Sequence, residues 1–113
     1  MRHVAESTEP LSEPVLLLLA SLAKEPLHGY ALMKDIEAMS NGRVRLSTGT
    51  LYGALRRLLD WGWIERFQTD DISRDKQAYR LTSLGRSQLK AEIARLKELA
   101  RLASAGLRTR EAR

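Results

Sequence analysis

The chain has 113 residues, of which 43% are hydrophobic and 29% charged, and its formal net charge is +5. That length provides one modest core, so we expect one small domain, and the hydrophobic content excludes a chain that is disordered throughout. The absence of cysteine excludes a disulfide framework, a thiolate zinc site and a cysteine nucleophile. The basic balance fits a polyanionic partner, although many basic proteins bind nothing specifically. The longest apolar run, Val15 to Ala20, is too short to cross a bilayer, so we expect a cytoplasmic protein without a membrane partner.

The chain begins with a polar arm and a first helix. Residues 1–12 show no periodicity and are expected to form a flexible arm. Apolar residues repeat at helical spacing from Val15 to Ala23, with Ser12 placed to cap the helix and Pro14 in its first turn. Pro26 ends this helix because the residue before a proline disfavours the helical conformation.

A second helix is expected to open at Leu27 and to run to about Met39, with its apolar residues on one stripe. The tripeptide Ser40-Asn41-Gly42 has the composition of a helix stop followed by a turn. The alternating residues 43–46 then form a short link that directs two apolar side chains inward and two arginines outward.

The stretch from Ser47 to Leu59 is predicted to form a third helix with two different faces. Its apolar residues fall on one side: Leu51, Ala54, Leu55, Leu58 and Leu59. The opposite side is small in the first turns and basic further on, which permits close approach to a DNA major groove. An ordinary amphipathic surface helix has the same pattern, so the rest of the chain must decide between the two interpretations. Gly62 is expected to end the helix in the left-handed conformation.

After Gly62 the period changes from helical to alternating. Residues 63–68 and 77–81 alternate as two strands and residues 69–75 are turn-like, which predicts a hairpin with a long tip. Thr82 and Ser83 are placed to cap a final helix, expected to run to about Ala105 with Gly106 as its stop. Its apolar residues follow the a/d spacing of a coiled-coil seam: Leu89, Ile93, Leu96, Ala100, Ala103 and Leu107.

This order of elements predicts a mainly α-helical fold with a small β-hairpin. We expect a winged helix-turn-helix DNA-binding domain over residues 13–82, in which the third helix reads the groove. A long C-terminal dimerisation helix is expected over residues 83–107, followed by a frayed tail over 108–113. The apolar seam is too narrow to remain exposed on a free helix, which favours a homodimer.

Four motifs occur in order between residues 14 and 90. They are Pro26-Leu27-His28-Gly29-Tyr30, then Leu46-Ser47-x-Gly49-Thr50-Leu51-Tyr52 followed by Ala54-Leu55-x-x-Leu58, then Gly62-x-Ile64-Glu65, and Tyr79-Arg80-Leu81-Thr82-x-x-Gly85. This combination resembles the PadR family of bacterial transcriptional regulators, and the single terminal helix resembles that of the family's short subfamily. The resemblance implies a homodimeric repressor that binds an inverted-repeat operator in a promoter and lies at the nucleoid when bound. It also implies release by a small aromatic or drug-like effector.

The chain departs from the family pattern in three places. Gly53 stands where the family usually has proline, which leaves the helix start less fixed and adds flexibility that costs about 0.5–1 kcal/mol. Ala78 stands where an aromatic is common. Trp61 and Trp63 stand where charged and aliphatic residues are commoner, and the terminal helix has no aromatic, so ligand stacking on that helix does not carry over.

Residues of the third helix are the main candidates for DNA binding. Four offer hydroxyls near its amino end: Ser47, Thr48, Thr50 and Tyr52. Ser47 and Thr50 also fit a role in capping the helix, and Tyr52 also fits a packing role. Arg56 is the leading candidate for a contact to a guanine edge or to the backbone. Arg57 fits a phosphate contact or an ion pair.

Two further places are expected to contact DNA. By resemblance, Tyr30 hydrogen-bonds a phosphate at the amino end of the second helix, and the alternative is a half-buried tyrosine that packs under the third helix. Arg74 and Lys76 lie at the hairpin tip, where a wing enters the minor groove or touches its rim. The neighbouring aspartates also fit a metal loop, but a solvated turn is the commoner outcome, so we expect no metal and no cofactor.

Trp61 and Trp63 have two interpretations. They line an effector pocket at the dimer junction, or they close the core between the third helix and the hairpin.

The sequence bears on three classes of function. The arginines at 43, 45, 56 and 57 and Lys76 favour a DNA-binding regulator with double-stranded promoter DNA as its partner. The alternative is a winged-helix protein-interaction module that does not read DNA, because a fold alone does not settle function. An enzyme is not expected, because the chain has two histidines, no cysteine and no evident nucleophile–base pair.

Overall fold

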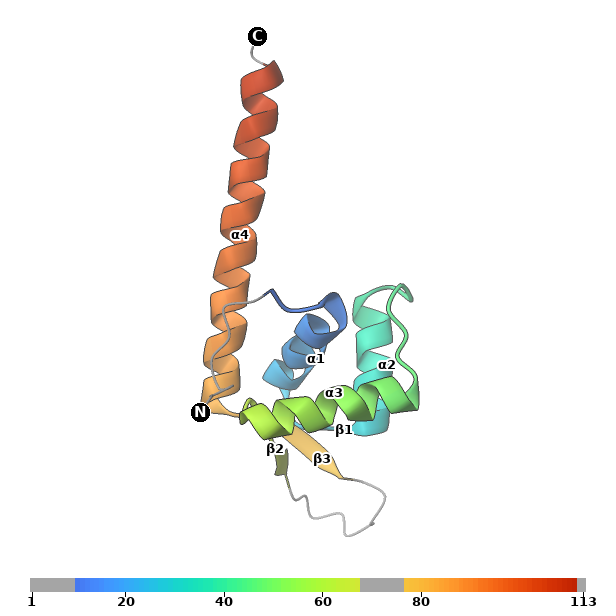
Figure 1. Ribbon diagram of the computed structural model, residues 1–113. Helices are drawn as coiled ribbons and strands as arrows, with labels where there is room; N and C mark the ends of the chain where they lie inside the picture. Colours follow the sequence, from blue (N-terminus) through green and yellow to red (C-terminus); the bar gives the residue numbers. More distant parts are fainter. Residues whose placement is uncertain (1–9, 68–76, 112–113) are drawn as a thin grey trace.

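The computed structural model describes residues 10–67 and 77–111 (Figure 1). They form α1 (Glu13–Lys24), β1 (Leu27–His28), α2 (Gly29–Met39), α3 (Thr48–Trp61), β2 (Ile64–Phe67), β3 (Ala78–Leu81) and α4 (Ser83–Glu111). The first three helices and the sheet form a globular body from which α4 projects (Figure 1). This is the predicted mainly α-helical winged helix-turn-helix fold with a long terminal helix. Among the described residues, no helix combines the length and hydropathy that a membrane span requires.

Local chemistry sets the ends of α1 and α3 as the sequence predicts. The Ser12 hydroxyl oxygen accepts a hydrogen bond from the Val15 amide at 3.3 Å, which caps α1. Ser47 caps α3 in the same way, because its hydroxyl oxygen accepts from the Thr50 amide at 3.1 Å. Gly62 ends α3 with φ of 78°, the left-handed conformation that glycine adopts without steric cost.

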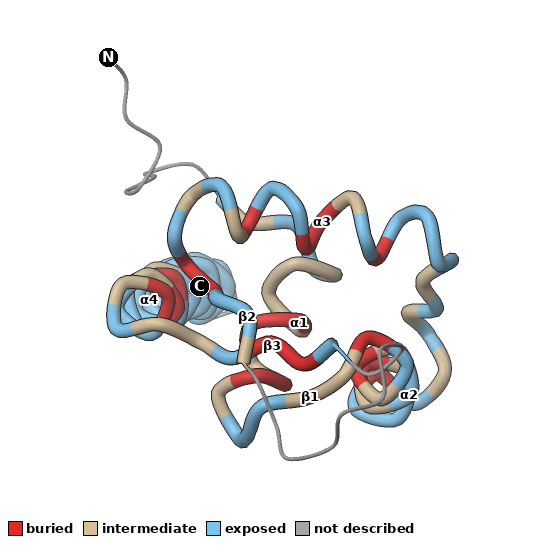
Figure 2. The backbone as a smooth tube through the Cα atoms, turned by 90° about the horizontal axis from the view of Figure 1, so that it is seen from below, coloured by how far each residue is buried: buried red, intermediate tan, exposed pale blue. Residues whose placement is uncertain are grey.

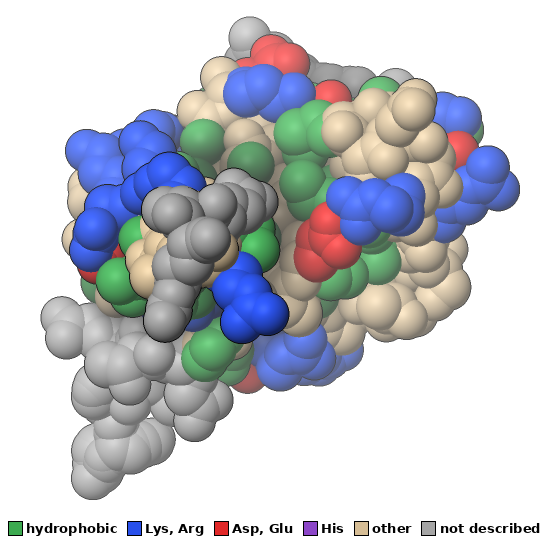
Figure 3. All heavy atoms as spheres, turned by 90° about the horizontal axis from the view of Figure 1, so that it is seen from above, with side chains coloured by type: hydrophobic (Ala, Val, Ile, Leu, Met, Phe, Trp, Pro, Cys, Tyr) green, Lys and Arg blue, Asp and Glu red, His purple; other side chains and the backbone are tan. Residues whose placement is uncertain are grey.

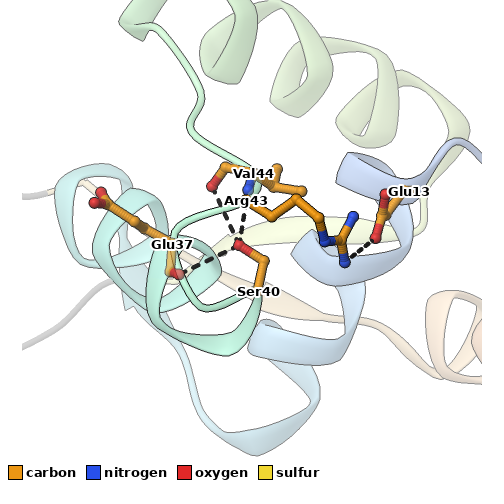
Figure 4. A network of polar contacts seen from close by, with 5 residues as sticks. All are labelled: Glu13, Glu37, Ser40, Arg43 and Val44. Carbon is orange, nitrogen blue, oxygen red and sulfur yellow. Dashed lines mark hydrogen bonds and ion pairs between the residues drawn. The ribbon is translucent and has the colours of Figure 1, made fainter.

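The turn between α2 and α3 is built around Ser40 (Figure 4). The Ser40 hydroxyl accepts from the Val44 amide at 2.8 Å and donates to the Glu37 carbonyl at 3.2 Å. The next two residues, at 41 and 42, have positive φ and reverse the chain. The Arg43 guanidinium then pairs with the Glu13 carboxylate, which ties the turn to α1. This network orients the link that leads into α3.

The sheet has three antiparallel strands in the order β1-β3-β2. Leu27 and His28 do not open the second helix as expected, because they pair with Tyr79 and Ala78 as strand β1. The helix prediction was wrong there because the segment after Pro26 is extended and satisfies the free edge of β3. The predicted hairpin therefore gains a third strand that anchors it to the body.

One core joins all the elements of the body. Buried residues from α1, α2, α3 and the strands face a common interior (Figure 2). The largest fully buried side chains are Trp63, Leu18, Leu19, Leu32, Ile36, Leu51, Leu55, Leu58 and Ile64. Leu89 brings the first turns of α4 to this core.

The terminal helix is longer than predicted. It continues through Gly106 to Glu111, so the expected end near Ala105 with a stop at Gly106 is wrong. The expected fraying of residues 108–113 stays a prediction. A glycine inside a helix costs about 1 kcal/mol but does not end it unless the chain turns into the left-handed conformation, and Gly106 has no positive φ.

Candidate nucleic-acid interface

Helix α3 buries one face and exposes the other. Leu51, Ala54, Leu55 and Leu58 are buried against the body. The predicted DNA-facing residues are all exposed: Thr48, Thr50, Tyr52, Arg56 and Arg57. The core therefore holds α3 by its apolar side, and its polar side is free to meet a ligand.

The hydroxyls at the amino end of α3 divide into two groups. Ser47 caps the helix, and its hydroxyl also donates to Thr50 Oγ1 at 3.0 Å, so both residues are engaged in the cap. Thr48 lies exposed in the first turn. In this structure, Ser47 and Thr50 therefore act in the helix cap, and DNA contact by either residue remains a prediction.

The two tyrosines on this surface differ in whether they pack against a neighbouring helix. Tyr30 has 69% of its surface exposed, with the Lys34 ammonium 5.7 Å from its ring centroid, so it does not pack beneath α3. Tyr52 instead reaches across to α2, where a Cβ added to Gly29 would lie 2.3 Å from the Tyr52 hydroxyl oxygen. Gly29 thus provides the space in which Tyr52 lies.

The arginines near α3 differ in whether a carboxylate neutralises them. Arg43 pairs with Glu13, and Arg45 Nε lies 3.5 Å from a Glu37 carboxylate oxygen. Arg56 and Arg57 have no carboxylate partner in the part of the chain that the structure describes. The two link arginines are thus weaker candidates for DNA contact than the two on α3. Arg74 and Lys76 lie outside the described residues.

A narrow cleft separates α3 from the wing strands. It has a volume of about 140 Å³ and is lined by Tyr52, Leu55, Arg56, Leu59, Arg66 and Tyr79. Arg66 was not among the predicted site residues. The alternation of β2 signals it, because a period of two places Arg66 on the same face as the buried Ile64.

The seam residues of α4 begin in the core and emerge from it. Leu89 is buried, whereas Ile93 and Leu96 are exposed. Ala100 and Ala103 are also exposed. Seen from above, Lys and Arg side chains lie on two sides of α4, and hydrophobic side chains border the hollow between this helix and the body (Figure 3). The predicted seam is therefore an uncovered apolar stripe in the single chain.

The two tryptophans pack against each other in a tilted arrangement at the end of α3. Their ring centroids are 4.9 Å apart, and the planes meet at 58°. Trp63 is fully buried in the core and Trp61 is half-buried against it. Trp63 therefore closes the core, as one of the two interpretations expected. Neither Trp61 nor Trp63 lines the cleft beside α3.

A second, larger cavity of about 460 Å³ lies where the end of α1 meets the start of α2. Its wall includes Lys24, Tyr30, Lys34 and Asp35. The Lys24 ammonium, 2.8 Å from the carboxylate, and the Ser21 hydroxyl lower the pKa of Asp35. Lys24 and Asp35 therefore neutralise each other, while Lys34, whose ammonium lies over the Tyr30 ring, adds a further positive charge to the wall. No group of metal-ligating side chains occurs within residues 10–67 and 77–111, and the hairpin aspartates lie outside these ranges.

The chain matches the model of the PadR-like family of transcriptional regulators over residues 18–91. It is similar to the crystal structure of a PadR family transcription regulator from Clostridium difficile R20291, with 21% identity, a TM-score of 0.70, and coverage of 85% of this chain and 99% of that chain. It is also similar to a PadR family transcriptional regulator from Eggerthella lenta DSM 2243, with 29% identity, a TM-score of 0.66, and coverage of 82% and 80% respectively.

A curated relative shares a shorter segment. An uncharacterized 37.1 kDa protein in transposon TN4556 of Streptomyces fradiae is 54% identical over 43 residues, which is 38% of this chain. The match spans only 12% of that protein's length.

Proposed function

The chain belongs to the PadR-like family of transcriptional regulators, and from that premise we propose that it is a homodimeric repressor that binds an inverted-repeat operator. Residues 13–82 form the DNA-binding unit in this proposal, and residues 83–107 form the dimerisation helix. The regulator acts in the bacterial cytoplasm and lies at the nucleoid when bound to DNA.

One observation carries the proposal: a polar face of α3 and an apolar stripe of α4 are both exposed on the same chain. Arg56 and Arg57 on α3 have no carboxylate partner among the described residues, so each is free to meet a phosphate or a base edge. The stripe around Leu96 gives two copies a common seam. Pairing places two reading helices roughly 34 Å apart, one turn of DNA.

Release by a small aromatic or drug-like effector is the last part of the proposal. Family membership supports it. The burial of Trp63 supports a structural role for that residue, so we place the effector elsewhere than between the two tryptophans.

The proposal predicts selective and salt-sensitive DNA binding. A gel shift should show tight binding to promoter fragments that the protein selects from genomic DNA, and weak binding to random duplexes. Arg56→Ala should weaken the selective binding by about 1–3 kcal/mol if the guanidinium contacts a base edge. Arg101→Ala is the matched control, because Arg101 is an exposed arginine on α4 already paired with Glu98.

Three results would overturn parts of this proposal. Equal affinity for selected and random DNA would remove the sequence-specific repressor, and no binding to either would favour a protein-interaction module. Unchanged binding by Arg56→Ala would remove that residue from the interface while leaving the function intact.

A further inference from the structure

Strands β2 and β3 carry two arginines on opposite faces, and the surroundings of the two differ. On the outer face, Arg80 Nε donates to a Glu65 carboxylate oxygen at 2.7 Å, and its guanidinium lies 4.7 Å from the Phe67 ring centroid. The strand register places Glu65 directly opposite Arg80. The charge of Arg80 is therefore neutralised within the wing.

On the inner face, Arg66 lies opposite Tyr79 and points toward α3. No carboxylate pairs with its guanidinium among the described residues. Arg56 faces it from α3, across the cleft of about 140 Å³. Two positively charged side chains thus line the same narrow cleft, and no acidic side chain among the described residues lines it with them. An anion in the cleft would relieve the repulsion between the two guanidinium groups.

The rest of the lining suits an oxyanion. Leu55 and Leu59 form the apolar part of the cleft's lining. Tyr52 and Tyr79 also line the cleft. Burial raises the pKa of Tyr79, with an added rise from Tyr52 and an opposing effect from Arg66, so Tyr79 keeps its proton at neutral pH and can donate it in a hydrogen bond.

We propose that the cleft between α3 and β2 seats one backbone phosphate of the DNA, with Arg66 as its principal ligand and Arg56 on the facing wall. Arginine suits this role because its planar guanidinium binds phosphate through two parallel hydrogen bonds. Arg66 comes from the strand beside the reading helix, so this contact fixes the position of α3 in the groove without reading sequence. The inference rests on the proposed DNA-binding function and adds a residue and a contact to it.

The test measures the affinity of the intact chain for a random-sequence duplex and for a selected promoter fragment at several salt concentrations. Arg66→Gln should reduce the slope of log affinity against log salt by about one unit, because one phosphate contact is lost. The affinity for both duplexes should fall by the same factor. Arg66→Lys should keep the slope, since the charge remains.

Arg80→Gln is the matched control, because it removes the same charge from the opposite face of the same hairpin. It should leave the slope within error of the parent chain. A thermal melt of each variant separates loss of binding from loss of folding.

Three outcomes would overturn the inference or its premise. If the parent chain binds neither duplex, the proposed function itself fails. If the parent binds and Arg66→Gln keeps its slope, only the phosphate seat fails. If Arg66→Gln and Arg80→Gln lose the same slope, the effect reflects net charge, and the cleft has no special role.

Discussion

Gly85 is the residue at which the start of the terminal helix packs against the backbone of Trp63. A Cβ added there would lie 2.0 Å from the carbonyl oxygen of Trp63 and 2.9 Å from its carbonyl carbon. The same carbonyl oxygen accepts a hydrogen bond from the Thr82 amide at 3.0 Å. The Thr82 hydroxyl oxygen in turn accepts a hydrogen bond from the Gly85 amide at 3.0 Å. The start of α4 is therefore fixed against the backbone between α3 and the wing, where no flexible side chain can move aside.

Gly85→Ala should lower the free energy of unfolding by about 1–3 kcal/mol, because the methyl group forces α4 away from Trp63. Chemical denaturation followed by circular dichroism measures this change. Gly106→Ala is the control: it lies in the same helix with nothing within 4 Å, so it should stabilise the helix by about 0.5–1 kcal/mol. Equal behaviour of the two variants would contradict the role of Gly85.

At the scale of elements, Glu92 links α4 to the segment before α1. Its carboxylate accepts two hydrogen bonds from Arg95, at 2.9 and 2.6 Å, and one from the Leu11 amide at 3.2 Å. The Glu92 side chain is only 6% exposed. The hydrogen bonds from Arg95 and, to a smaller degree, from Leu11 lower the pKa of Glu92 against the opposing effect of burial. The charged form therefore holds these elements together.

This arrangement predicts an acid-sensitive stability. A carboxyl group whose pKa is lowered on folding stabilises the fold fully when the pH is above the group's ordinary pKa, about 4.3 for glutamate. This stabilisation is lost as the pH falls below that value and through the lowered pKa of the folded state. The free energy of unfolding should therefore decline in acid. Glu92→Gln should be less stable at neutral pH and should show a shallower decline, in denaturant titrations at fixed protein concentration.

Glu98→Gln is the control for that comparison. Glu98 forms the same pair with Arg101 three residues on, but both side chains are largely exposed. Solvent screens such pairs, so this variant should follow the parent curve closely. If the two variants had the same curve, Glu92 would have no special role in acid stability.

At the scale of the whole molecule, α4 dominates the shape. The described chain extends 64 × 38 × 22 Å, and the distal part of the helix lies away from the body (Figure 1). A helix this long with an apolar stripe needs a partner surface, because isolated helices gain their stability mostly from packing. We expect that partner to be a second α4.

The parent chain should therefore sediment as a dimer, and Leu96→Glu should sediment as a monomer. The charge would lie in the apolar seam, where no water can solvate it. Leu102→Glu should remain dimeric, because Leu102 lies about 120° around the helix from Leu96 and so outside the seam. Leu102 is the more exposed of the two side chains, at 51% against 38% for Leu96, so exposure alone would not explain the difference. Analytical ultracentrifugation at several concentrations distinguishes these outcomes. A monomeric parent chain would contradict the two-half-site geometry.

The sequence by itself determined the features that depend on neighbours along the chain. Ser12, Ser47 and Gly62 mark helix ends because a cap needs only the next three residues or a left-handed backbone. The two faces of α3 follow from a period of 3.6, and the separation of Glu65 from Arg66 follows from a period of two. Helix order, the wing and the faces of α3 were therefore predictable.

The tertiary structure alone decided the features that depend on residues far apart in the chain. It places Leu27 and His28 at the free edge of β3 and lays Tyr52 across Gly29. It also decides which arginines are neutralised, because an ion pair such as Arg43 with Glu13 requires two distant segments to meet. Arg66 became a candidate ligand only when the fold set it opposite Arg56, since sequence spacing carries no information about charges that face each other across a cleft.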